Sequence, residues 1–278
     1  MSLRQSISRC IPGSIKTIIR TKKAHNDLNK LDQIECRQSN LISSTSFNLR
    51  NIFISKETDK EWKSSKIKLN NINLPDGTGG INPGDRRAVF YLIRHFKPLR
   101  VLEIGTHIGA STINIASALS DIENAKLTTV DLLDVNDPKA KPWKKYHAKL
   151  SPDEMIKELK FSNLVNFVTS PSHDYLLNCT QKFDFIFLDG GHEADTVYRE
   201  IPAALNLLNN SGVVLLHDYY ENLMPLWKNG SVIPGPYLAI ERLKSEGASL
   251  KVIPLGELPW PTKLGSKFTS LGLLTSFD

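Results

Sequence analysis

The chain has 278 residues, 40% of them hydrophobic and 23% charged, a length that fits one large α/β domain with an appendage. No run approaches the roughly 18 consecutive apolar residues that a membrane span needs, so we expect a soluble, cytoplasmic protein. Cys10, Cys36 and Cys179 lie far apart and form no CxxC pair, which predicts no disulfide framework and no zinc knuckle and fits a reducing compartment.

The formal net charge of +6 comes from the N-terminus. Residues 1–25 contain six of the 35 Lys and Arg residues and no acid, so the remaining chain carries 29 basic and 29 acidic side chains. Nonspecific affinity for nucleic acid comes from clustered Lys and Arg that release counterions. The neutral body therefore argues against a nucleic-acid partner.

The first 25 residues predict a short amphipathic helix, because Ile11, Ile15, Ile18 and Ile19 follow helical spacing beside basic residues. Three interpretations stay open. The segment resembles a cleavable transit peptide, it is suited to lie on an anionic membrane surface, and it equally fits a solvated helix docked on the core or on a partner subunit. These interpretations lead us to consider membrane-surface contact by residues 1–25 and assembly of the chain into a homo-oligomer.

Residues 26–75 are polar with scattered apolar positions, so we assign residues 1–75 to an N-terminal basic and polar extension and residues 76–278 to the main domain. The glycine-rich segment 76–80 predicts a flexible loop. A helix opened by Pro83 and Asp85 follows it. The apolar face of that helix comprises Val89, Phe90, Leu92, Ile93 and Phe96.

Downstream, short β-branched runs alternate with amphipathic helices, which predicts a Rossmann-like, doubly wound and mostly parallel α/β sheet. The parallel strands are expected at Arg100–Ile104, Leu127–Val130, Val165–Val168, Phe183–Leu188 and Gly212–Leu216. Helices are expected at Ala110–Leu119, Pro152–Lys160, Glu193–Leu208 and between Pro236 and Gly247. Strands near 250–253 and 268–274 would complete seven strands as an antiparallel C-terminal hairpin.

The strongest motif is VLEIGTHIGAST at residues 101–112, a hydrophobic strand that runs through a glycine turn into a helix. Gly105 and Gly109 allow a sharp turn and a close approach to a ligand, and the helix points its first amides at the site. The motif lacks the GxGxxG spacing of dinucleotide sites, and Glu103 would repel a phosphate but attract an ammonium or sulfonium group. Asp131 follows the next strand, where a carboxylate can accept hydrogen bonds from both ribose hydroxyls. Together these residues fit an adenosyl amino acid.

The fourth and fifth strands end in Asp189-Gly-Gly-His192 and His217-Asp218. Neighbouring parallel strands bring their carboxyl ends together, so we expect Asp189 and Asp218 to converge, as carboxylates do around a divalent cation. His192, with the near-neutral pKa of an imidazole, is the expected general base. For His217, metal ligand, base and structural bridge all stay open.

These motifs resemble class I S-adenosylmethionine-dependent methyltransferases over residues 80–278, in particular the metal-dependent small-molecule and sugar O-methyltransferases and the cephalosporin-hydroxylase-like branch. The resemblance implies S-adenosylmethionine as cofactor, with Mg²⁺ or another divalent cation as a further candidate. It implies cofactor contacts from Glu103, Gly105, Thr106, His107, Gly109, Ser111, Asp131 and Ser172. It implies catalysis by His192 and Asp189, and metal ligation by Asp189, His217 and Asp218.

The sequence departs from this branch at one point. The position of His217 is often acidic there, and Tyr219 replaces an amide ligand of catechol-type enzymes, so a softer metal, or none, stays open. The resemblance also implies that the segment Thr169-Ser-Pro-Ser-His173, after the third strand, lies beside the adenine.

The expected function is methyl transfer to a hydroxyl of a small molecule or glycan. One rival is a cofactor-binding or docking protein without catalysis, and another is an NAD-dependent oxidoreductase, which Glu103 and the missing third glycine disfavour. Two further groups of residues have open roles. The aromatic side chains after the fifth strand either line an acceptor pocket or pack locally: Tyr219, Tyr220, Trp227 and Tyr237. The lysines after the second strand either form a solvated face or attract an anionic acceptor: Lys139, Lys141, Lys144 and Lys145.

Overall fold

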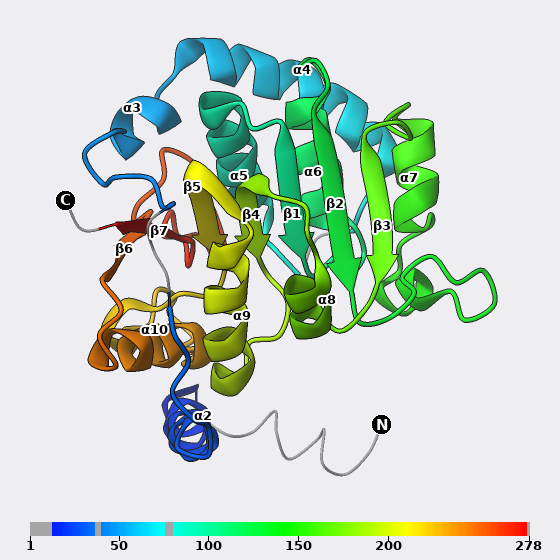
Figure 1. Ribbon diagram of the computed structural model, residues 1–278. Coiled ribbons are helices and arrows are strands. Elements are labelled where there is room, and N and C mark those ends of the chain that lie inside the picture. Colours follow the sequence, from blue (N-terminus) through cyan, green and yellow to red (C-terminus); the bar gives the residue numbers. More distant parts are fainter. Residues whose placement is uncertain (1–12, 37–39, 76–79, 277–278) are drawn as a thin grey trace.

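The computed structural model describes residues 13–36, 40–75 and 80–276 (Figure 1). Its centre is a seven-stranded sheet in the order β3-β2-β1-β4-β5-β7-β6. The strands are β1 (Arg100–Ile104), β2 (Lys126–Asp131), β3 (Val165–Thr169), β4 (Phe183–Leu188), β5 (Leu208–Leu216), β6 (Leu250–Pro254) and β7 (Gly272–Ser276). The first five are parallel, and β7 runs antiparallel to both β5 and β6. The predicted Rossmann-like sheet with an antiparallel C-terminal hairpin is confirmed.

Helices cover both faces of the sheet (Figure 1). One face is covered by α5 (Pro83–Phe96), α6 (Ala110–Leu119) and α7 (Pro152–Glu158), with α3 (Leu49–Phe53) and α4 (Lys56–Ile72) packed outside them. The other face is covered by α8 (Ser172–Asn178), α9 (Ala194–Asn206) and α10 (Gly235–Ser245), with α2 (Gly13–Leu28) packed on α9 and α10. Two short 3₁₀ helices lie in loops, at Pro142–Tyr146 and Glu221–Leu223.

The strands are hydrophobic runs because both of their faces are buried. In β4, Phe185 and Phe187 join the core beneath α5 and α6, while the alternating residues Ile186 and Leu188 join the core beneath α9. All four side chains are buried. Because successive side chains of a strand point to opposite faces of the sheet, β4 contributes residues to two separate cores.

The residues before position 76 add apolar side chains to these same two cores. Trp62 of α4 packs edge-on against Phe90 of α5, with 5.2 Å between ring centroids. On the other face, Ala24 and Leu28 of α2 are buried in the core formed by α9 and α10. The boundary between residues 75 and 76 stays a prediction. The predicted flexible loop lies, except for Gly80, outside the described residues, as do Cys10 and Ile11.

Several element ends differ from expectation, and the largest differences are at the starts of β5 and β7. The strand β7 starts at Gly272 instead of residue 268, because Phe268 makes only an isolated bridge to Glu257 and is 45% exposed. The strand β5 starts four residues early, at Leu208, where its register against β4 shifts between Phe183 and Phe185. The helix α9 correspondingly stops at Asn206. Within the described residues, no helix is both long and apolar enough to cross a membrane.

Candidate active site

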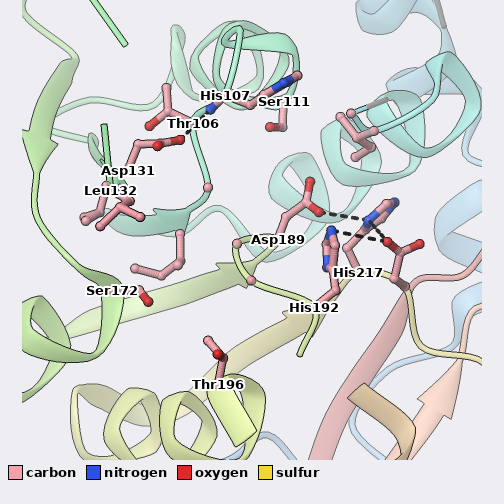
Figure 2. A pocket seen from close by; sticks show the side chains of 18 of the residues that line it. Thr106, His107, Ser111, Asp131, Leu132, Ser172, Asp189, His192, Thr196 and His217 are labelled. Atoms are coloured by element: carbon pink, nitrogen blue, oxygen red, sulfur yellow. Dashed lines mark hydrogen bonds and ion pairs between the residues drawn. The ribbon is translucent and has the colours of Figure 1, made fainter. Parts of the chain in front are cut away.

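The site lies where the strand order reverses. From β1 the sheet continues to β2 in one direction and to β4 in the other, so the loops after these strands diverge at their carboxyl ends and leave a crevice. A cavity of about 500 Å³ occupies it. Ten of the predicted site residues line this cavity (Figure 2), namely Gly105, Thr106, His107, Ser111, Asp131, Ser172, Asp189, His192, His217 and Asp218.

Gly105 is required by a close approach of backbones. Its φ is +100°, and a β-carbon at this position would collide with the carbonyl oxygen of Asp189. The amide of Asp189 donates to the carbonyl of Ile104 at 2.9 Å, and that of Gly105 donates to Val130 at 2.8 Å. The glycine therefore lets the ends of β1, β2 and β4 meet at the cavity.

Gly109 has a different role from the expected ligand contact. It precedes α6 with a φ of +78°, and a β-carbon there would press on Pro152 and Met155 of α7. It does not line the cavity. Its glycine character serves the left-handed backbone and the packing between two helices.

Asp131 is held in place at the cavity wall by backbone amides. Its Oδ2 accepts a hydrogen bond from the amide of His107 at 2.8 Å, and its Oδ1 accepts one from the amide of Leu133 at 3.1 Å. The His107 ring packs against Tyr146, and burial lowers its pKa, which favours a neutral imidazole. The carboxylate thus faces the cavity with a fixed orientation, as Figure 2 shows.

The structure places Glu103 beneath the cavity, which corrects its expected role as a direct ligand contact. It is fully buried, and the hydroxyls of Thr112 and Thr129 both donate to its Oε2 at 2.6 Å. Burial raises the pKa of Glu103 to about 7 in spite of these hydrogen bonds. Thr129 also lies 2.6 Å from the hydroxyl of Thr106. We therefore assign Glu103 to positioning the glycine loop from below.

On the opposite wall, two histidines and two aspartates form one cluster (Figure 2). The Nδ1 of His217 lies 2.9 Å from Oδ1 of Asp189 and 3.5 Å from Oδ2 of Asp218. The Nε2 of His192 lies 3.5 Å from the same Oδ2 of Asp218. The predicted convergence of the ends of β4 and β5 therefore occurs.

A third aspartate, Asp85 at the start of α5, completes this cluster and was not expected there. Its Oδ2 lies 3.5 Å from Nε2 of His217, and its side chain is fully buried. The amide nitrogen of Asn82 donates to that Oδ2 at 2.6 Å, and the indole of Trp260 anchors the same helical turn through the carbonyl of Gly84 at 2.9 Å. An acidic residue in the first turn of a helix is common because it interacts favourably with the helix dipole, so nothing in the sequence indicated that Asp85 lies in this cluster.

These carboxylates favour the charged form of His217. Burial alone would lower its pKa, but the charges of Asp189 and Asp218 outweigh burial and raise the pKa well above its ordinary value. For Asp218, burial would raise the pKa, yet His217 lowers it below its ordinary range. The raised pKa of His217 and the lowered pKa of Asp218 both favour an ion pair in this cluster.

The expected metal ligation by Asp189, His217 and Asp218 stays a prediction. A protonated ring nitrogen has no lone pair for a metal, so the imidazolium form of His217 would compete with metal binding. Among the described residues, no group of three His, Cys, Asp or Glu side chains is arranged to hold a metal ion. The contacts of His217 with Asp189 and Asp218 are those expected of a structural bridge, and its roles as metal ligand and as base stay predictions.

The expected adenine segment lines the cavity through Ser170, Pro171 and Ser172 only. The hydroxyl of Ser172 donates to Glu200, a buried acid of α9 that the sequence did not single out. Burial raises the pKa of Glu200 to about 7. The aromatic residues after β5 pack on each other instead of lining this cavity, as Tyr220 does on Trp227.

The comparisons with known proteins agree with this architecture. The family model described as a methyltransferase domain matches residues 102–219, which run from β1 to the residues just after β5. No curated protein matches the chain.

Similar solved structures include the O-methyltransferase TomG from Streptomyces achromogenes, involved in tomaymycin synthesis and solved in complex with SAM. It is 19% identical, with 82% of this chain and 94% of that chain covered and a TM-score of 0.53. A putative O-methyltransferase from Klebsiella pneumoniae is 18% identical, with 81% and 91% covered and a TM-score of 0.53. An O-methyltransferase from Bacillus cereus, in complex with SAH, is 17% identical, with 83% and 95% covered and a TM-score of 0.51. At these identities the solved structures establish the shared fold, and the family model identifies residues 102–219 as a methyltransferase domain.

Proposed function

We propose that this methyltransferase transfers the methyl group to a hydroxyl oxygen of a small molecule or glycan, with His192 as general base. The observation that carries this proposal is a single cavity with two unlike walls. One wall presents the Gly105 turn, Asp131 and Ser172. The other wall presents His192, His217, Asp189 and Asp218, and the buried Asp85 contacts His217 without lining the cavity.

The first wall fits the donor. Asp131 offers oxygens of fixed orientation to a ribose, and Gly105 leaves the cavity edge free of a side chain. When bound, S-adenosylmethionine supplies a methyl group on a positively charged sulfur. Asp189 lines the same cavity, where its carboxylate favours a positive charge nearby.

The second wall fits the proton transfer. The side chain of His192 is 38% exposed, so a hydroxyl in the cavity can reach its imidazole. As the acceptor oxygen bonds to the methyl carbon, the carbon–sulfur bond breaks and its electron pair stays on sulfur. The hydroxyl proton moves to His192, and the carboxylate of Asp218 stabilises the imidazolium that results. His217 holds Asp218 and Asp189 in position from behind.

The test is turnover by a His192→Gln variant, measured as S-adenosylhomocysteine formed over a panel of sugar and phenolic hydroxyl acceptors. We expect at least one acceptor to be methylated by the wild type. With that acceptor we expect kcat to fall about 10²–10⁴-fold in the variant, because the base is lost, while KM for S-adenosylmethionine stays the same. His25→Gln, an exposed histidine of α2, is the matched control.

The rival of a cofactor-binding protein without catalysis makes a different prediction. It requires S-adenosylhomocysteine to bind with no turnover on any acceptor. A variant with unchanged kcat on a methylated acceptor would instead remove His192 from the mechanism.

A further inference from the structure

A second cavity of about 260 Å³ adjoins the first and shares His192 and Glu193 with it. Its other walls come from segments far apart in sequence, α2 and the residues that lead into α10. From α2 they are Arg20, Lys23, Ala24 and Asp27, and from the second segment Ile233, Pro234 and Gly235. The N-terminal helix therefore reaches the edge of the active site.

Two cations, Arg20 and Lys23, and two acids, Asp27 and Glu193, line this second cavity. Lys23 lies 3.6 Å from Asp27, and Lys30 lies 2.9 Å from the other oxygen of Asp27, so two lysines share one carboxylate. Arg20 donates only a 3.4 Å hydrogen bond to the carbonyl of Val232, and within the described residues no carboxylate lies within ion-pair distance of it. Lys23 is thus paired with Asp27, whereas Arg20 is the cation of this cavity that has no ion-pair partner among the described residues.

We infer that the second cavity is the acceptor subsite and that Arg20 binds a carboxylate or phosphate group of the acceptor. This inference rests on the proposed function, because it places the reacting hydroxyl at His192. A guanidinium presents paired donors that match a carboxylate or a phosphate, and its carbonyl bond keeps the head group at the cavity. The substrate class is then an acidic sugar or another small anion, either uronic or phosphorylated.

Binding of matched sugars tests this subsite independently of turnover. The protein, saturated with S-adenosylhomocysteine, is titrated calorimetrically with glucuronate, glucose 6-phosphate and glucose. We expect one of the two anions to bind at least about tenfold more tightly than glucose, and that anion identifies the acidic group. In Arg20→Ala we expect this preference to be lost.

Lys22→Ala is the control, because Lys22 carries the same charge on the same helix but lies exposed outside both cavities. Equal binding of glucose and both anions, no binding of any sugar, or an unchanged preference in Arg20→Ala would overturn the subsite. Such a result leaves the proposed function standing if methyl transfer still depends on His192. Loss of turnover on every acceptor would instead count against the proposed function.

A separate observation concerns the outer face of α2, defined here by Ile15, Ile18 and Ile19. These side chains are 47%, 67% and 58% exposed. They lie away from Ala24 and Leu28, which pack against α9 and α10. Lys16, Lys22 and Lys23 border them on the same helix.

We propose that this outer face docks on an anionic lipid surface. Three adjacent isoleucines are costly to expose to water, and a helix with apolar and basic residues side by side is suited to the boundary between lipid headgroups and acyl chains. The neighbouring lysines match anionic headgroups in charge. Docking there would present the second cavity, on the adjoining side of α2, close to the membrane.

Co-sedimentation with vesicles tests the docking. We expect the protein to sediment with phosphatidylglycerol-containing vesicles and not with pure phosphatidylcholine vesicles. Combined Ile15→Ser, Ile18→Ser and Ile19→Ser should reduce the bound fraction at least about tenfold, and Ile67→Ser, on the 70% exposed Ile67 of α4, should not. No sedimentation, or sedimentation that the triple variant keeps, would overturn the proposal. A dimer in light scattering that the triple variant abolishes, without vesicle binding, would assign the face to a second copy of the chain.

Discussion

The Nδ1 of His217 lies 2.9 Å from Oδ1 of Asp189, a contact that joins the carboxyl ends of β5 and β4. The parallel register makes this contact possible, because the amide of His217 donates to the carbonyl of Leu188 at 3.0 Å, one residue before Asp189. The sheet therefore sets the distance between the two side chains. A proton on His217 supplies the positive charge between the carboxylates.

From this contact we expect methyl transfer to be independent of added divalent metal. A proton on His217 offsets one of the two negative charges of Asp189 and Asp218, so a metal ion bound between them would have to displace this proton. The measurement is kcat after dialysis against a chelator, compared with kcat in added Mg²⁺, and the two should agree. Loss of activity on chelation with recovery on Mg²⁺ would return these residues to metal ligation.

Asp131→Ala should weaken binding of S-adenosylhomocysteine by about ten- to a hundredfold, since hydrogen bonds to a charged group contribute about 1.5–3 kcal/mol each. Calorimetric titration measures it. Asp218→Ala is the comparison: it should leave this affinity within a factor of about three and lower kcat, because Asp218 contacts the two histidines. Equal loss of affinity in both variants would contradict the division of the cavity into donor and acceptor walls.

Gly105→Ala should destabilise the protein by more than the about 1–2 kcal/mol that a left-handed backbone alone costs. The added β-carbon would collide with the backbone carbonyl of Asp189, which cannot move without disturbing β4. Gly247→Ala is the matched control, because Gly247 has the same φ of +100° with nothing within 4 Å of its added β-carbon. Urea unfolding of the three proteins gives the difference. Similar losses of unfolding free energy in both variants would mean that the positive φ, and not the collision with Asp189, accounts for the destabilisation.

Glu200→Gln should flatten the dependence of stability on pH. Burial raises the pKa of Glu200 from 4.5 to about 7 in the folded chain, so the folded state binds this proton more tightly than the unfolded state does. Wild-type stability from this group is present below pH 4.5 and is lost as pH rises to about 7, by about 3 kcal/mol in total.

Urea unfolding at pH 5 and pH 8 measures this. The fall in unfolding free energy between the two pH values should be smaller in Glu200→Gln than in the wild type. Glu158→Gln, at the exposed end of α7, should behave like the wild type. If the unfolding free energy of Glu200→Gln fell between the two pH values as much as that of the wild type, ionisation of Glu200 would not destabilise the folded state.

Much of the architecture follows from local sequence. The bounds of β1, β4 and α6 match the expected ranges, because a run of apolar residues closed by a glycine or an acid determines a strand end by itself. The cavity wall of Gly105, Asp131 and Ser172 was likewise predictable, since each residue follows a strand and parallel strands end at one edge. Element ends that depend on strand pairing could not be predicted from local sequence, as the start of β7 shows.

The sequence by itself thus determined the sheet, the cavity wall around Gly105 and Asp131, and the meeting of Asp189 with His217 and Asp218. Only the tertiary structure decided that Glu103 lies below the cavity, that Asp85 faces His217 and that Arg20 borders the second cavity. The physical reason is that the burial of a side chain and the charges near it are set by the residues that surround it in the folded protein. Those surroundings join α2, α5 and the strand ends across more than a hundred residues, where no local pattern records them.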